Sequence, residues 1–167
     1  MRQSTTKLIK GGTVVLGQTV SRQDVLVTGE TITAIGDQTG FAVDEIYDAK
    51  GLLVLPGAVD PHIHFNESNK GHRGVHDYFI GTRAAAFGGT TSVIDFSDQI
   101  HDKPLLNVLW VKEEQAKGRA LIDWSVHPIL SNITPEIIGE VPGLIAAGMP
   151  TFKCFMTFRT PAGDSAE

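Results

Sequence analysis

Two histidines separated by one residue, His62 and His64, lie in the motif VDPHIHF. Side chains two apart on a strand point to the same face, so both imidazoles can converge on one metal ion. Such a pair also arises by chance or within a core. Its place at the end of the first strand of a strand-and-helix repeat favours metal binding, because barrel enzymes build their active sites at that end.

A lysine, Lys153, interrupts the apolar, aromatic run TFKCFMTF at residues 151–158. This run is typical of a parallel strand buried on both faces, where a free ammonium is costly to bury. The lysine could instead snorkel to solvent at an open strand end. A lysine that has added carbon dioxide becomes an anionic carbamate, whose two oxygens can bridge two metals about 3.5 to 4 Å apart. We expect the carbamate, because Lys153 and the histidine pair hold equivalent places at strand ends.

Alternating strands and helices after Pro56 position these residues. Strands are expected at about 57–64, 90–96, 121–130 and 151–158, with helices in HDYFIGTRAAAFGG, DKPLLNVLWVKEEQAKG and TPEIIGEVPGLIAAG. In the helices we expect Pro104 in a first turn and Thr134 as an N-cap. Units recurring roughly every thirty residues predict a parallel sheet with right-handed crossovers, half of an eightfold barrel. A compact, open four-stranded α/β domain is the alternative.

The first 55 residues have a different pattern, with short β-rich segments punctuated by glycine: KLIKGGTVVLG, QDVLVTGETITAIG and EIYDAKGLLVLPG. Alternation of apolar and polar residues predicts a small antiparallel sheet with one face in water. We therefore expect two regions, at residues 1–55 and 56–167.

Composition limits the partners. The chain of 167 residues is 41% hydrophobic and 20% charged, with a net charge of -5 and scattered basic residues. This indicates a globular protein that binds a small molecule and no nucleic acid. The single cysteine, Cys154, excludes an internal disulfide, suits a reducing compartment and is expected in the core. No apolar run approaches the roughly 20 residues that span a bilayer, and no leader is evident. We expect a soluble cytoplasmic protein without a membrane partner.

Three motifs in order, LPGAVDPHIHF, GTRAAAFGGTTSVIDF and GMPTFKCFM, resemble the cyclic amidohydrolases: hydantoinase, dihydropyrimidinase, allantoinase and dihydroorotase. The resemblance covers almost the whole chain. It implies an α/β fold in which residues 1–55 form part of a small β-sandwich and residues 56–167 form the first half of a (β/α)8 TIM barrel. It also implies two zinc ions bridged by a hydroxide and a carboxylated lysine. His62 and His64 match ligands of one metal, and Lys153 matches the carboxylated bridging lysine.

Some residues that the family needs have no match in this sequence. They are two histidine ligands from the fifth and sixth strands and an aspartate from the eighth, which is both ligand and general base. We therefore expect an N-terminal part that is inactive alone, and a full-length enzyme that is a homotetramer or homodimer. The implied reaction opens the ring of a cyclic amide through attack by the metal-bridging hydroxide.

Two positions bear on the substrate. Asn66 stands where dihydroorotases carry an arginine that grips the substrate carboxylate, and asparagine cannot replace that charge. Phe158 stands where hydantoinases commonly carry a tyrosine that donates to the oxyanion. The stretch HFNES resembles allantoinases, but SNKGH departs from their pattern. We favour a hydantoin or dihydropyrimidine substrate, with allantoinase as the alternative.

Other readings stay open. A non-catalytic, dihydropyrimidinase-related scaffold is disfavoured because the histidine pair and Lys153 are retained. A metal-dependent deaminase shares the histidine pair but uses no bridging lysine. Asp60 could orient the histidines or cap a loop. His127, in DWSVHPIL, could face the site or form a hydrogen bond at a strand end.

Overall fold

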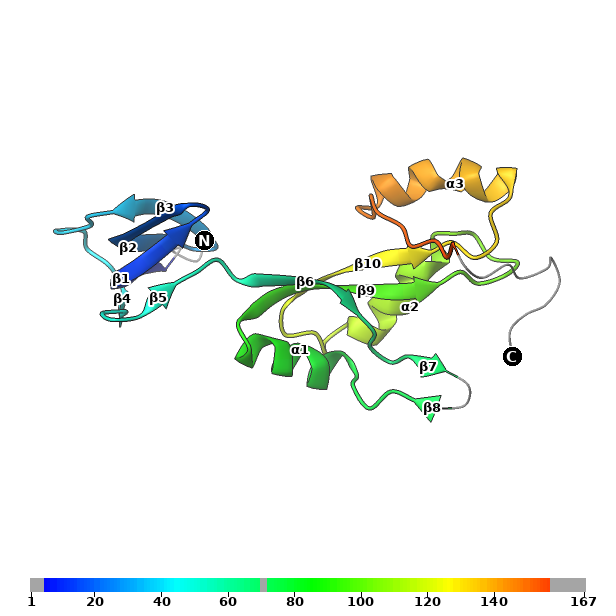
Figure 1. The fold of residues 1–167 in the computed structure, drawn as a ribbon, viewed down its shortest axis with the longest axis horizontal. Coiled ribbons are helices and arrows are strands. Elements are labelled where there is room, and N and C mark those ends of the chain that lie inside the picture. The colour runs from blue at the N-terminus through cyan, green and yellow to red at the C-terminus, as the bar shows by residue number, and fades with distance from the viewer. Residues whose placement is uncertain (1–4, 70–71, 157–167) are drawn as a thin grey trace. The chain divides into compact units, whose positions relative to one another are not determined.

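The computed structural model describes residues 5–69 and 72–156 (Figure 1). The chain divides into two compact units, Met1–Pro56 and Gly57–Glu167. In the part of the chain that is described, no helix is long and apolar enough to cross a membrane.

The first unit is a five-stranded sheet built around β1. Its strands are β1 (Thr6–Leu16), β2 (Thr19–Thr28), β3 (Thr31–Gly36), β4 (Glu45–Asp48) and β5 (Leu53–Val54). The first three strands are antiparallel neighbours, whereas β4 and β5 both run parallel to β1. The expected all-antiparallel sheet is therefore wrong for β4 and β5. The carboxylate of Asp44 accepts from the Thr6 amide at 2.6 Å, which starts β4 beside the start of β1 and fixes the parallel direction.

The second unit contains a three-stranded parallel sheet in the order β10-β9-β6. Its elements are β6 (Ala58–Ile63), the short pair β7 (Ser68–Asn69) and β8 (His72–Arg73), α1 (Tyr78–Phe87), β9 (Thr90–Asp98), α2 (Asn107–Ala116), β10 (Asp123–Ile129) and α3 (Pro135–Ala146). Consecutive parallel strands are neighbours and are separated by helices, so the expected α/β repeat is confirmed. Within the described residues the sheet is open, and a closed barrel is not seen.

The segment after α3 differs from the fourth strand expected from the sequence. Lys153 forms one parallel bridge to Ile129, with its amide donating to the Pro128 carbonyl at 2.9 Å. The segment therefore lies next to β10, in sequential order. The expectation of a strand buried on both faces is wrong for residues 151–156, because Thr151, Cys154, Phe155 and Met156 are exposed. Cys154 is exposed and not in the core.

Helix ends follow the local sequence signals with one exception. The Asp77 carboxylate caps α1 by accepting from the Ile80 amide at 2.8 Å, and Thr134 caps α3. Each cap satisfies an amide that has no partner within its helix. The expected placement of Pro104 in the first turn of α2 is wrong, because α2 begins at Asn107.

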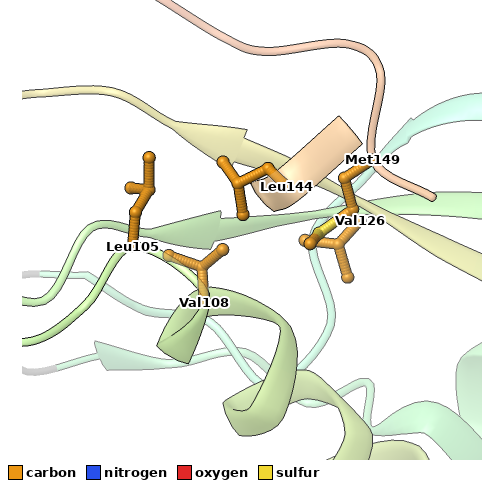
Figure 2. Close-up of a cluster of buried hydrophobic side chains, with 5 residues drawn as sticks. All are labelled: Leu105, Val108, Val126, Leu144 and Met149. Atoms are coloured by element: carbon orange, nitrogen blue, oxygen red, sulfur yellow. The ribbon is translucent and has the colours of Figure 1, made fainter. Parts of the chain in front are cut away.

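An apolar cluster joins α2 and α3 to one face of β10. It consists of Leu105, Val108, Val126, Leu144 and Met149, whose side chains converge in Figure 2. Burial of each such side chain contributes about 1.5 to 3 kcal/mol. A second cluster lies beneath the loop after β6 and contains Phe65, Tyr78, Val93 and Ala116. These two clusters fix the carboxyl ends of the strands relative to one another.

Candidate metal centre

The two histidines come together at the end of β6. Their ring centroids lie 5.4 Å apart, and the rings are tilted by 59°. Two imidazoles on one tetrahedral zinc, with zinc–nitrogen bonds of about 2 Å, have centroids about 5 Å apart. The pair therefore fits a single metal ion. Asp60 accepts from the backbone amide of His62 at 3.1 Å, so it fixes the strand end and not an imidazole ring.

One aromatic ring, that of Phe96 on β9, contacts all the candidate site residues at the strand ends. Its centroid is 4.5 Å from the ring of His62 and 5.0 Å from that of His64. The Nζ atom of Lys153 lies 4.3 Å from the same centroid, and the ring of His127 lies 5.5 Å away. The histidine pair and the lysine, which are distant in the sequence, are therefore neighbours in the structure.

A carboxylate accompanies the second histidine. The Nδ1 atom of His64 lies 3.4 Å from a carboxylate oxygen of Glu67. A carboxylate on one imidazole nitrogen orients the ring and leaves the other nitrogen for a metal. This role of Glu67 was not predicted from the sequence, although a carboxylate three residues after an imidazole was a usable signal.

His127 faces this site and lies opposite Phe96 in the register of β9 and β10. Burial lowers the pKa of the His127 imidazole, and the nearby charge of His62 lowers it further. The imidazole is therefore neutral near pH 7. Of the two roles considered from the sequence, the structure favours a residue that faces the site.

Asn66 lines a pocket of about 260 Å³ beside the histidine pair. The pocket is also lined by His64, Phe96, Ser97 and Asp98. Asn66 adopts a left-handed conformation, with φ of 53°, which asparagine tolerates better than most residues. Asn66 therefore shares this pocket with His64, one of the candidate metal ligands. Phe158, the other residue expected to contact substrate, lies outside the described residues.

The available donors make up part of a metal centre. Among the residues that the structure describes, no three histidine, cysteine, aspartate or glutamate side chains form a group that could hold a metal ion. The donors that do converge are the two imidazoles of His62 and His64, and Lys153 contacts the same Phe96 ring. Imidazole nitrogens suit zinc, and a carbamate on the lysine would supply anionic oxygens. The set fits a metal, provided that further ligands complete it.

Comparisons with known proteins agree with this geometry. No family model matches the chain. D-hydantoinase of Geobacillus stearothermophilus is 37% identical over 155 residues, which are 92% of this chain and 33% of that protein. D-phenylhydantoinase of Escherichia coli is 36% identical over 160 residues, which are 94% of this chain and 34% of that protein. The crystal structure of dihydropyrimidinase from Brevibacillus agri NCHU1002 superimposes with a TM-score of 0.88 at 34% identity, covering 93% of this chain and 34% of that one.

The chain spans about a third of the length of the curated relatives that it matches. The match extends over both compact units and includes the strand ends that carry His62, His64 and Lys153. By sequence and by fold, the chain is a homologue of the N-terminal part of the cyclic amidohydrolases of the hydantoinase and dihydropyrimidinase group.

Proposed function

We propose that this chain supplies part of the active site of a hydrolase that opens the ring of a cyclic amide of the hydantoin or dihydropyrimidine type. One observation carries the proposal: His62, His64 and Lys153 gather around Phe96, in a chain related to hydantoinases. In the complete enzyme, residues 1–55 would belong to a β-sandwich and residues 56–167 to a (β/α)8 barrel, within a homodimer or homotetramer.

Three side chains hold the metals in this proposal. His62 and His64 would bind one zinc ion, and a carbamate on Lys153 would supply anionic oxygen ligands. When bound, the metals would polarise the amide carbonyl and lower the pKa of the attacking water. An unmodified ammonium would repel both cations, so carboxylation converts a repulsive group into a ligand. Glu67 orients the imidazole of His64.

In this proposal, uncharged side chains contact the substrate, which suits an uncharged cyclic amide. Asn66, in the pocket beside His64, offers an amide donor and acceptor to an uncharged cyclic amide. It provides no positive charge for a substrate carboxylate. The neutral imidazole of His127 can donate or accept a hydrogen bond at the same site. A general base would take the proton of the attacking water and then, as a general acid, deliver it to the leaving nitrogen.

The test measures the metal content and intact mass of the longest native product of the gene that encodes this chain, purified without chelator in the presence of bicarbonate. We expect about two zinc ions per chain and the mass of a carbamate, both lost together in Lys153→Ala. Lys117→Ala is the matched control, because the Lys117 side chain is 80% exposed and its nearest carboxylate oxygen, on Glu114, is 4.0 Å away. Hydrolysis of hydantoin and dihydrouracil, with allantoin as the competing substrate, would then identify the substrate class.

The proposal fails if the purified protein carries no metal, or if Lys153→Ala retains the same metal content as the Lys117→Ala control. Preference for allantoin over both other substrates would overturn the substrate class and leave the metal centre intact.

A further inference from the structure

A charged cluster is buried beneath the loop that follows the histidine pair. Asp95 is fully buried and Lys112 is 7% exposed. The Nζ atom of Lys112 lies 2.8 Å from Oδ2 of Asp95, and the Tyr78 hydroxyl donates to the same oxygen at 2.9 Å. Removing two charges from water is costly, and a buried ion pair is poor evidence of added stability. The cluster formed by Asp95, Lys112 and Tyr78 therefore calls for a role other than stability.

The ion pair holds both backbone polar groups of Phe65, the residue next to His64. The Phe65 amide donates to Oδ1 of Asp95 at 3.2 Å, and Nζ of Lys112 donates to the Phe65 carbonyl at 3.1 Å. Hydrogen bonds to charged groups are roughly twice as strong as neutral ones. The backbone that follows His64 is thus held at both the amide and the carbonyl group of Phe65.

The same carboxylate also holds the strand that carries the shared aromatic ring. Oδ1 of Asp95 accepts from the Phe96 amide at 2.8 Å. Successive side chains on a strand point to opposite faces, so Asp95 lies on the helix-covered face of β9 and Phe96 on the face with the histidines. One carboxylate is therefore linked to both histidine rings, through Phe65 on one side and Phe96 on the other.

Packing fixes the Phe65 side chain in the same place. Its ring packs edge-on against the ring of Tyr78, with centroids 5.3 Å apart. Helix α1 approaches so closely at Gly81 that a Cβ atom there would lie 2.1 Å from the Phe65 ring. The loop after β6 is thus held by hydrogen bonds to the Phe65 backbone and by close packing of the Phe65 ring.

We propose that Asp95, Lys112 and Tyr78 are positioning residues for the metal-binding pair. They set the separation and tilt of His62 and His64 before a metal binds, so the metal does not have to order the loop. The inference deepens the proposed function and rests on it for the identity of the pair. It does not depend on the reaction, because its readouts are metal affinity and backbone protection.

The test uses Co²⁺ as the probe and compares Lys112→Met and Tyr78→Phe with the unchanged protein. We expect a loss of Co²⁺ affinity of about 10- to 100-fold in Lys112→Met and a smaller loss in Tyr78→Phe. Lys112→Arg, which can still donate to Asp95 and to the Phe65 carbonyl, should restore most of the affinity. Amide hydrogen exchange without metal should be faster at Phe65 and Phe96 in both weakened variants.

Two controls separate positioning from stability. Leu144→Ala opens a cavity in the apolar cluster of Figure 2 and should lower stability without changing Co²⁺ affinity. Arg119→Ala removes the exposed ion pair with Asp77, at 3.1 Å, and should change neither. If Lys112→Met does not fold, Tyr78→Phe decides the matter, since it removes one hydroxyl and keeps the ring.

Unchanged Co²⁺ affinity in folded Lys112→Met, or unchanged exchange at Phe65 in Tyr78→Phe, would overturn the inference. Co²⁺ binding without opening of a cyclic amide by the longest native product of the gene would contradict the proposed function alone. If even the unchanged protein binds no Co²⁺, the metal centre fails, and the exchange rates at Phe65 and Phe96 still decide whether the cluster holds this loop.

Discussion

Two buried clusters in the second unit are built from opposite kinds of side chain. The apolar cluster of Figure 2 packs five apolar side chains, each 1% exposed, between β10 and its helices. The charged cluster joins Asp95, Lys112 and Tyr78 beneath the histidine pair, through hydrogen bonds of 2.8 and 2.9 Å. Both exclude water, but only the second places particular atoms by directional contacts.

The comparison suggests separate roles: the apolar cluster contributes stability, and the charged cluster positions the residues around it. Apolar burial is non-directional and roughly proportional to area, so the first cluster can repack after a volume-conserving change. Hydrogen bonds between charged groups depend on distance and angle, and they are costly if a partner is lost. Directional hydrogen bonds lie directly below the residues proposed to bind a metal. Non-directional apolar contacts lie farther along the sheet.

The largest effect on stability is expected for Lys112→Met. It leaves the Asp95 carboxylate buried without a cation and should lower the free energy of unfolding by about 4 kcal/mol. The double variant Asp95→Asn with Lys112→Met removes the unpaired charge and should recover part of that loss. Urea unfolding followed by circular dichroism measures both. A double variant less stable than the single one would contradict this account of the cluster.

A smaller loss, about 3 kcal/mol, is expected for Leu144→Ala in the apolar cluster. Its matched control is Leu144→Met, which keeps the volume and should cost less than about 1.5 kcal/mol. Neither should alter Co²⁺ affinity. A change of affinity in Leu144→Ala would show that the two clusters do not have separate roles.

Gly81→Ala disturbs the Phe65 ring, which packs against the charged cluster, by steric contact and without changing any charge. The added methyl group would meet the Phe65 ring and should lower the free energy of unfolding by about 2 kcal/mol, despite the higher helix propensity of alanine. Displacement of Phe65 should also weaken Co²⁺ binding. Gly139→Ala, in α3, is the control, because a Cβ atom there would meet nothing within 4 Å. Equal Co²⁺ affinity in the two variants would exclude a steric link through Phe65.

The smallest effect concerns alkaline pH. Burial, followed by the charge of Asp95 and the hydrogen bond to it, raises the pKa of the Tyr78 hydroxyl. Above about pH 10 the unfolded chain loses this proton and the folded chain keeps it, so stability falls as pH rises, by up to about 1.4 kcal/mol per pH unit. Tyr78→Phe should make that fall less steep between pH 10 and 11. The hydrogen bond to Glu45 also raises the pKa of Tyr47, but this side chain is exposed, so Tyr47→Phe should flatten the slope less than Tyr78→Phe does.

Local signals account for what the sequence predicted correctly. Apolar periodicity and the helix caps gave the alternating strands and helices, and the histidine spacing brought His62 and His64 together at a strand end. The direction of β4 and β5 was not predictable, because short β-rich segments do not encode the strand that they join. The exposure of residues 151–156 depends on which elements cover the segment, which is a tertiary property.

The charged cluster was missed for a similar reason. Asp95 interrupts the apolar run TSVIDF just as Lys153 interrupts TFKCFMTF, and both are charges at positions where burial is expected. The partner of Asp95 lies on α2, the helix that follows β9, and no sequence spacing connects Asp95 with Lys112 and the backbone of Phe65. A charge inside a buried strand should therefore be read as one half of an unidentified pair.

The sequential order of the parallel strands has an evolutionary consequence. Each strand-and-helix unit adds its own residue to a single rim of the sheet: the histidine pair from β6, Phe96 from β9, His127 from β10 and Lys153 from the segment beside β10. A point substitution at one strand end can therefore change the chemistry while the helices and the apolar cluster stay as they are. Descendants of such a chain can acquire new substrates one rim position at a time, without having to fold anew.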